Sequence, residues 1–188
     1  MKLSILVPSV GRRTLYRTLR SLVEQPLLTE GPDADEVLVI GGPAAAIAPF
    51  VGCGVRHLPH PPGGHWGCEE RTAGMAVATG THLAFLDDDD RWLPGARAAI
   101  ADGLDETPDA PQLFRMRYYH GGVLWEAPVV EEGNVSTQMI VIPNDPAQLG
   151  TWTTRREGDY DFLMSMRWPM EAIRWRPAVI AYLGRRPQ

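Results

Sequence analysis

Short apolar segments alternate with amphipathic segments through the first half of the chain, and no other feature restricts the fold as much. Four apolar segments are typical of buried strands: residues 3–7, 36–40, 55–58 and 82–86. Three segments have the residue spacing of helices: 14–25, 69–78 and about 94–104. Strands separated by helices pair in parallel through crossover connections, because a tight turn cannot join parallel neighbours. The sequence therefore predicts an α/β protein with an open, mostly parallel sheet that binds ligands at the carboxyl ends of its strands.

The second half of the chain has a different pattern. Residues 112–119 and 123–126 flank His120-Gly121-Gly122 and predict an antiparallel hairpin. Two more strands are predicted at 138–142 and 178–183, with a helix at 160–168 between them. A chain of 188 residues is long enough for one domain with its own core, and no repeat or linker divides it. We therefore expect a single domain over residues 1–188.

Charge and hydropathy argue against several classes of protein. The chain has 18 basic and 23 acidic side chains and a net charge of −5, which is unfavourable for broad binding to nucleic acid or anionic membranes. No apolar run approaches the roughly 20 residues that span a bilayer. Pro8 interrupts the apolar run near the N-terminus, and no small-residue cleavage site follows it. We expect a cytoplasmic protein with no nucleic-acid partner and no membrane span.

Cysteines and histidines are concentrated in one short segment. Its members are Cys53, His57, His60, His65 and Cys68. These side chains are zinc ligands in other proteins, but their spacing is not that of a known zinc finger, and most are explained as strand or loop residues. Two cysteines are too few for a disulfide framework, which favours a reducing compartment. Whether the segment binds anything is left open.

Four consecutive aspartates, Asp87-Asp88-Asp89-Asp90, follow the strand predicted at 82–86. Like charges a few ångströms apart repel and raise one another's pKa. A hard divalent cation relieves this repulsion, and carboxylates are the ligands that Mg²⁺ and Mn²⁺ prefer. A solvated acidic turn before the helix that begins near Pro94 is the simpler explanation. The position at the carboxyl end of a strand favours the metal site.

Four segments of the chain match, in order, the motifs of one enzyme family. They are Ser4-Ile5-Leu6-Val7-Pro8-Ser9, Glu70-Arg71-Thr72-Ala73-Gly74, the run Phe85-Leu86-Asp87-Asp88-Asp89-Asp90-Arg91-Trp92-Leu93-Pro94, and Gly158-Asp159-Tyr160-Asp161-Phe162-Leu163. This set resembles the family 2 glycosyltransferases with the GT-A fold. In that family an opening strand, an Ala-Arg-Asn-x-Gly helix, a Leu-Asp-x-Asp-Asp motif and a Glu-Asp-Tyr-Asp-Leu segment follow one another.

The resemblance implies a metal-dependent glycosyltransferase of the hexosyltransferase type. Such an enzyme transfers a sugar from a nucleotide-sugar donor to an acceptor hydroxyl, with inversion and without processive addition. Residues 1–93 would bind the donor and residues 94–188 the acceptor, which is a glycan, a protein or a small molecule. Met164 replaces the glutamine of the Gln-x-x-Arg-Trp motif that processive synthases carry, which favours single transfer.

The resemblance also implies a role for each matching residue. Asp87 and Asp89 would hold Mn²⁺ or Mg²⁺, which stabilises the departing nucleoside diphosphate. Asp159 would be the catalytic base that takes the acceptor proton, although capping of a helix also explains this residue. Trp92, Trp152 and Asp161 would contact the acceptor. The donor would be contacted by Pro8, Ser9, Gly11, Arg12, Gly41, Arg71, Asp87 and Asp88.

The chain departs from the family pattern where the nucleoside is usually contacted. After the second strand the family has Val-Asp-Asp-Gly-Ser, whereas this chain has Ile40-Gly41-Gly42-Pro43. Because no carboxylate is available there to pair with a particular base, we expect weaker discrimination among nucleoside diphosphates than the family shows. Gly158 likewise replaces the acid that precedes the catalytic aspartate.

Three further questions stay open. A catalytically degenerate member of the fold would bind a nucleotide-sugar or glycan without turnover; the altered nucleoside loop favours this reading, and retention of Asp89 and Asp159 opposes it. A nucleotidyltransferase would usually carry a glycine-rich basic loop after the first strand, but residues 9–13 hold one glycine. A homodimer is compatible with the tryptophan-rich, hairpin-containing second half.

Overall fold

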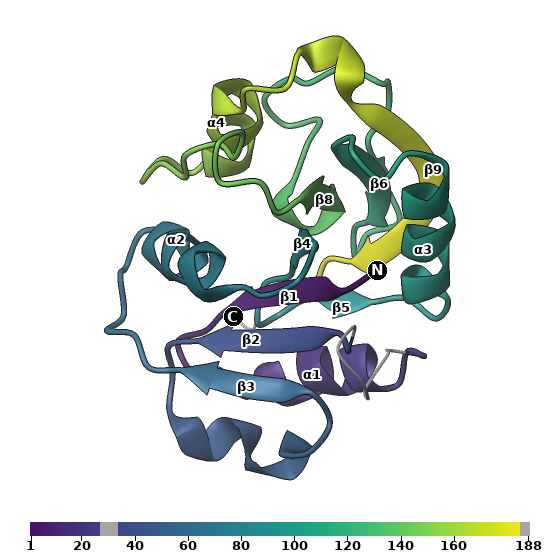
Figure 1. Cartoon of the computed structure of the whole chain (residues 1–188). Coiled ribbons are helices and arrows are strands. Elements are labelled where there is room, and N and C mark those ends of the chain that lie inside the picture. Colours follow the sequence, from purple (N-terminus) through teal and green to yellow (C-terminus); the bar gives the residue numbers. More distant parts are fainter. Residues whose placement is uncertain (27–33, 185–188) are drawn as a thin grey trace.

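A computed structural model describes residues 1–26 and 34–184 of the chain. In this part of the chain, one sheet contains nine strands in the spatial order β3-β2-β1-β4-β8-β6-β9-β5, with β7 paired to β6. Figure 1 shows helices on both sides of the sheet. The α/β class predicted from the alternating segments is confirmed.

The first four strands form the parallel half of the sheet. They are β1 (Leu3–Pro8), β2 (Glu36–Ile40), β3 (Val55–Leu58) and β4 (His82–Phe85), and every pair that they make with one another is parallel. The connections contain α1 (Leu15–Val23), a 3₁₀ helix η1 (Ala44–Phe50) and α2 (Cys68–Val77). The strands and α-helices predicted for this half are all present; η1 was not predicted.

The second half of the sheet mixes both directions. It consists of β5 (Arg91–Trp92), β6 (Gln112–Arg117), β7 (Val123–Leu124), β8 (Ile140–Pro143) and β9 (Arg174–Tyr182), with α3 (Ala96–Glu106), α4 (Gly158–Ser165) and the 3₁₀ turns η2 (Thr137–Met139) and η3 (Met170–Ala172). The predicted hairpin is the antiparallel pair β6 and β7. β8 runs antiparallel to β4 and β6, whereas β9 runs parallel to β6.

Alternate residues of β1 enter two separate cores. Leu3, Ile5 and Val7 pack with Leu15 and other residues of α1 on one face of the sheet. On the other face, Leu6 packs with residues of α2 and α4. Because both faces are covered, β1 and β2 are buried along their whole length, which is why all their residues except Ser4 and Glu36 are apolar.

A buried polar network joins the amino-terminal parts of β1 and β2. The Ser4 hydroxyl donates to Glu36 Oε1 at 2.6 Å and accepts from the Gly80 amide at 2.8 Å. Thr79 donates to the same Glu36 oxygen from its amide and its hydroxyl, and Arg56 pairs with Glu36 Oε2 at 2.5 Å. These hydrogen bonds hold in place the segment that joins α2 to β4. The aspartate run follows β4.

We expect Ser4→Ala to lower the free energy of unfolding by about 1–3 kcal/mol, because the buried Gly80 amide loses its acceptor. Arg56→Ala is the matched control on the same Glu36 carboxylate. Its side chain is 58% exposed, so we expect a loss below about 1 kcal/mol. Urea unfolding of both variants measures the difference, and equal losses would contradict this account.

In the part of the chain that the structure describes, no helix combines the length and the apolar character needed to cross a membrane.

Candidate active site

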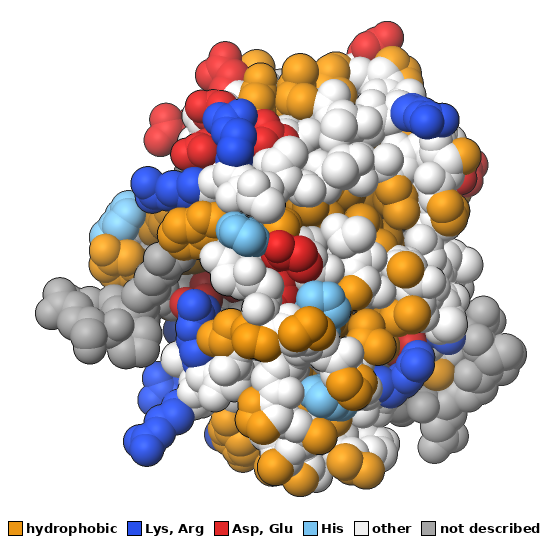
Figure 2. Space-filling view, turned by 90° about the vertical axis from the view of Figure 1, so that its left-hand side faces the viewer, with side chains coloured by type: hydrophobic (Ala, Val, Ile, Leu, Met, Phe, Trp, Pro, Cys, Tyr) orange, Lys and Arg blue, Asp and Glu red, His pale blue; other side chains and the backbone are white. Residues whose placement is uncertain are grey.

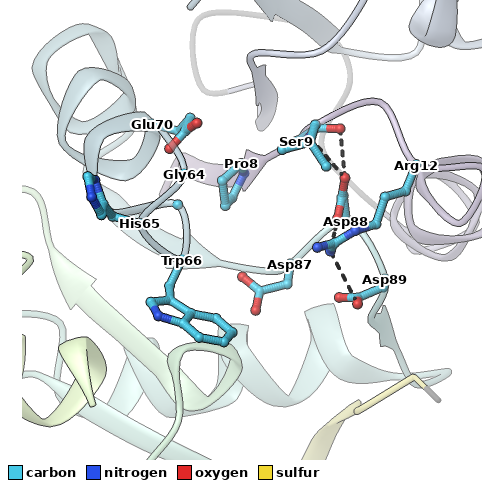
Figure 3. Close-up of a pocket in the computed structure, with 12 residues that line it drawn as sticks. Pro8, Ser9, Arg12, Gly64, His65, Trp66, Glu70, Asp87, Asp88 and Asp89 are labelled. Atoms are coloured by element: carbon cyan, nitrogen blue, oxygen red, sulfur yellow. Dashed lines mark hydrogen bonds and ion pairs between the residues drawn. The ribbon is translucent and has the colours of Figure 1, made fainter. Parts of the chain in front are cut away.

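The carboxyl ends of β1 and β4 and the amino-terminal end of α2 enclose a pocket of about 290 Å³. Figure 2 views the molecule from the side toward which β2 and β3 point and shows acidic side chains gathered in a hollow on that face. Figure 3 shows the lining residues, which come from three parts of the chain. They include Pro8 at the end of β1, Ser9 and Arg12 after it, His65, Trp66 and Glu70 around the start of α2, and Asp87, Asp88 and Asp89 after β4.

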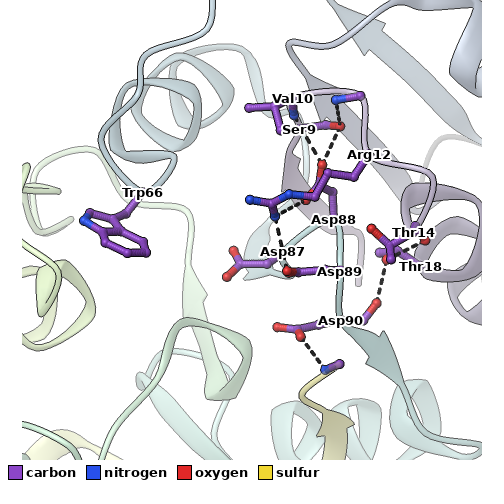
Figure 4. Close-up of polar contacts among 12 residues, drawn as sticks. Ser9, Val10, Arg12, Thr14, Thr18, Trp66, Asp87, Asp88, Asp89 and Asp90 are labelled. Atoms are coloured by element: carbon purple, nitrogen blue, oxygen red, sulfur yellow. Dashed lines mark hydrogen bonds and ion pairs between the residues drawn. The ribbon is translucent and has the colours of Figure 1, made fainter. Parts of the chain in front are cut away.

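The four consecutive aspartates do not point the same way. Asp88 is 2% exposed, and its Oδ2 accepts hydrogen bonds from the Ser9 hydroxyl at 2.8 Å and the Val10 amide at 3.2 Å. Its Oδ1 pairs with Arg12 at 2.8 Å, and the same guanidinium nitrogen lies 3.2 Å from Asp89 (Figure 4). Asp88 therefore holds the loop after β1 against the end of β4, and contact with a donor at Asp88 would compete with these bonds.

The other three aspartates converge. Asp87, Asp89 and Asp90 each place one carboxylate oxygen within 4.8 Å of the others. The sequence analysis paired Asp87 with Asp89, and the structure adds Asp90 to them. Three carboxylates at this spacing form a donor set that suits Mg²⁺ or Mn²⁺, so the residues present fit the cation implied by the resemblance.

Within this cluster, the pKa of Asp90 is clearly raised. Burial and the neighbouring charge of Asp87 raise the pKa of Asp90 to about 8, although the Gly184 amide and the Gln138 side chain donate to its carboxylate. Gln138 also donates to Asp87 Oδ2 at 3.2 Å and so links the two acids. A cation bound among these oxygens would remove the repulsion that raises this pKa.

Arg71 occupies the boundary between this pocket and a second one. Its buried guanidinium pairs with Asp87 Oδ1, donates to the Trp66 carbonyl at 2.6 Å and lies 4.8 Å from the centre of the Trp152 ring. Trp66 and Asp87 line both pockets. Trp66 is half-exposed and has a φ of 54°, a strained conformation for a bulky residue that is often found at functional sites.

Asp159 lines the second pocket together with Arg71, Asp87 and Trp152. It lies in the first turn of α4, where the Tyr160 amide donates to its Oδ1 at 2.8 Å. Burial raises the pKa of Asp159 to about 6, against the lowering effects of the Tyr160 amide and the Arg71 charge. A carboxyl group with this pKa is deprotonated near neutral pH and can accept a proton.

The three residues predicted to contact an acceptor lie in different surroundings. Trp152 lines the second pocket and stacks on Phe162 with the ring centres 4.3 Å apart. Trp92 requires a correction, because its side chain is 2% exposed and packs in the core between α1 and the sheet. Asp161 accepts hydrogen bonds from Thr153 and Arg155 and is not among the residues that line the second pocket.

Two glycines predicted to contact the donor lie behind the first pocket and do not line it. Gly11 and Gly41 have φ values of 81° and 82°, and a Cβ on either would lie within 2.7 Å of a neighbouring atom. They permit close packing between the loops after β1 and β2, which a residue with a side chain could not adopt without strain. Pro8, Ser9 and Arg12, for which the resemblance also implies donor contact, line the pocket.

The cysteine and histidine segment is only partly brought together. Among the described residues, His65 and Cys68 converge with Glu69, whereas Cys53, His57 and His60 take no part in this group. His57 instead bonds the carbonyls of the β2 loop. Burial raises the pKa of the Cys68 thiol to about 11, which disfavours the thiolate that zinc requires.

Sequence reasoning missed Asp90, Gln138 and Glu70. Asp90 carried no signal that distinguished it from its three identical neighbours. Gln138 lay at the start of a predicted strand, but it belongs to the turn η2, from which its side chain reaches Asp87 and Asp90. Glu70 was the one departure from the Ala-Arg-Asn-x-Gly motif that introduces a charge, and this could have drawn attention to it.

The open α/β sheet, with an acidic cluster beyond the end of a central parallel strand, has the GT-A glycosyltransferase fold, and the family comparison agrees. The model for glycosyl transferase family 2 matches residues 4–169. The chain belongs to glycosyl transferase family 2. A search of curated proteins finds no match.

Solved structures of TarS from S. aureus are similar to this chain. A crystal structure of TarS 1–349 has a TM-score of 0.75 and 17% identity and covers 98% of this chain. A crystal structure of TarS 1–349 in complex with UDP-GlcNAc also has a TM-score of 0.75 and 17% identity, and it covers 100% of the chain. The present chain spans 60% of TarS 1–349 and 37% of the longer TarS structure.

Proposed function

We propose that this protein transfers a sugar from a nucleotide-sugar donor to an acceptor hydroxyl, with a divalent cation bound by Asp87, Asp89 and Asp90. The observation that carries the proposal is that two pockets meet at Asp87, with Asp89 of the acidic cluster lining one and Asp159 lining the other. A leaving diphosphate and an attacking hydroxyl need two such sites side by side.

The first pocket fits the donor. Residues 1–93 supply its lining, and the similar TarS structure contains UDP-GlcNAc. Mn²⁺ or Mg²⁺ would act there as a Lewis acid toward the developing charge of the diphosphate. Asp87 and Arg71, joined by their ion pair, would orient the donor at the mouth shared with the second pocket.

The second pocket fits the acceptor. Asp159 lines it and has a raised pKa, so it can accept the proton of an attacking hydroxyl. Trp152 stacks on Phe162 and lies against the Arg71 guanidinium. Its ring therefore forms a wall of the pocket and holds these two side chains in position. Attack from the Asp159 side, with the diphosphate on the Asp87 side, gives inversion at the anomeric carbon. We propose a single transfer for each donor bound.

Binding of the donor is tested by thermal unfolding with nucleoside diphosphates. At 100 times Kd a ligand that binds only the folded state adds about 2.7 kcal/mol, which for a domain of this size raises Tm by about 5–10 °C. We expect this shift with Mn²⁺ present and its loss with EDTA. No shift with any nucleotide in Mn²⁺ would contradict the proposal. Release of free sugar or transfer to an acceptor distinguishes an enzyme from a protein that only binds the donor.

A further inference from the structure

A buried carboxylate that the proposed mechanism does not use lies at the back of the first pocket. Glu70 projects from α2, is 2% exposed and lines the pocket. Its Oε1 accepts a hydrogen bond from the Gly63 amide at 3.0 Å, but its Oε2 is buried and has no hydrogen-bond partner among residues 1–26 and 34–184. An unpaired buried carboxylate oxygen is costly, so this atom calls for a donor that a ligand supplies.

Glu70 also lies where a carboxylate is missing from the loop after β2. Gly41 stands at the position of the first aspartate in the Val-Asp-Asp-Gly-Ser pattern, and Glu70 stands at the alanine of Ala-Arg-Asn-x-Gly. A Cβ on Gly41 would lie 3.8 Å from Glu70 Cγ. The acid that the loop lacks is therefore matched in space by an acid that the helix has acquired.

The surroundings restrict what can reach this oxygen. In the view of Figure 3, Pro8 lies between Glu70 and Asp87, and all three residues line the same pocket. A nucleotide with its diphosphate at Asp87 would thus direct its base toward Glu70. The Gly63 amide holds the Glu70 carboxylate in place from the loop beside it.

We propose that Glu70 selects the nucleobase of the donor by accepting a hydrogen bond from a ring N–H, as presented by uracil, thymine and guanine. The inference rests on the proposed function, since it needs a nucleotide in this pocket. An ionised carboxylate only accepts hydrogen bonds. Cytosine and adenine present a ring nitrogen that also only accepts, so binding them would leave two acceptors facing each other. Glu70 thus restores the discrimination that the absence of an acid at Gly41 would remove.

The test compares UDP with CDP, whose bases differ at the ring nitrogen that Glu70 would contact. Calorimetric titration in Mn²⁺ should show that the wild-type protein binds UDP about ten- to a hundredfold more tightly than CDP, the range expected for one unpaired buried group. TDP and GDP should group with UDP, and ADP should group with CDP.

Glu70→Gln is the decisive variant, because it has nearly the same shape. Its carbonyl oxygen can keep the bond from the Gly63 amide, which turns the NH₂ group toward the base. We expect UDP to bind more weakly and CDP more tightly, so that the preference disappears or reverses. Glu69→Gln makes the same change of charge one residue away and should keep the preference for UDP. A melting curve establishes that each variant is folded.

Each result has a distinct meaning. If the wild-type protein binds UDP and CDP equally, or if Glu70→Gln keeps the wild-type preference, Glu70 does not select the base while the proposed function stands. If Glu69→Gln loses the preference as Glu70→Gln does, the effect belongs to net charge and the inference fails. If no nucleoside diphosphate binds in Mn²⁺, the proposed function itself fails. Should Glu70→Gln not fold, the five wild-type affinities still test the inference, because any grouping other than UDP, TDP and GDP above CDP and ADP would overturn it.

Discussion

Asp89→Asn is expected to remove metal-dependent donor binding while leaving the fold intact. Asp89 contributes one of three carboxylate oxygens that lie within 4.8 Å of one another. A cation there stabilises diphosphate charge by several kcal/mol, so losing a ligand should weaken nucleoside diphosphate binding in Mn²⁺ by about 10²–10³-fold. Stability should hold or rise slightly, because the substitution also removes a charge from a crowded acidic cluster.

Calorimetric titration of UDP with Mn²⁺ and with EDTA measures this effect. The wild-type protein should lose affinity in EDTA, and Asp89→Asn should bind with similar, low affinity in both conditions. Asp105→Asn removes one negative charge from an exposed position on α3 and should behave as the wild type does. Unchanged affinity of Asp89→Asn in Mn²⁺ would show that this carboxylate is not a metal ligand.

The strands of the parallel half could be predicted from the sequence because this half of the sheet is buried on both faces. β1 and β2 are mostly apolar because α1 covers one face and α2 the other, so a short apolar run marks each strand. The second half was harder to predict from local pattern. β5 has two residues, and in it the exposed Arg91 lies over Tyr182 while Trp92 enters the core. A strand this short gives no alternation to detect, so the sequence does not show that Trp92 faces the core.

The motifs of the candidate site could be predicted from the sequence, but the directions of its side chains could not. The aspartate run identified the place, but four identical residues carry no information about which of them converge on a common point. Their directions depend on partners far away in the sequence: Ser9 and Arg12 turn Asp88 aside, whereas Gln138 and Gly184 hold Asp90 in the cluster. Such contacts form only when the chain folds, and no local period encodes them.

Asp159→Asn is expected to keep donor binding and lose transfer. The amide has the shape of the carboxylate but cannot take the acceptor proton, so we expect kcat to fall by about 10²–10⁴-fold. Asp161→Asn is the matched control in the same helix, because Asp161 is already bound to Thr153 and Arg155. UDP affinity in Mn²⁺ should be the same in both variants and in the wild type, since Asp159 does not line the donor pocket.

The pH dependence of transfer provides a second measurement on the same residue. Because burial raises the pKa of Asp159 to about 6, the base is deprotonated above that pH and becomes protonated as the pH falls through it. Wild-type kcat/KM should therefore decline about tenfold per pH unit below about pH 6, and the residual transfer by Asp159→Asn should lack this decline. Transfer by Asp159→Asn at close to the wild-type rate would leave Asp159 as a helix cap, and the base would then have to be another group within reach of the acceptor.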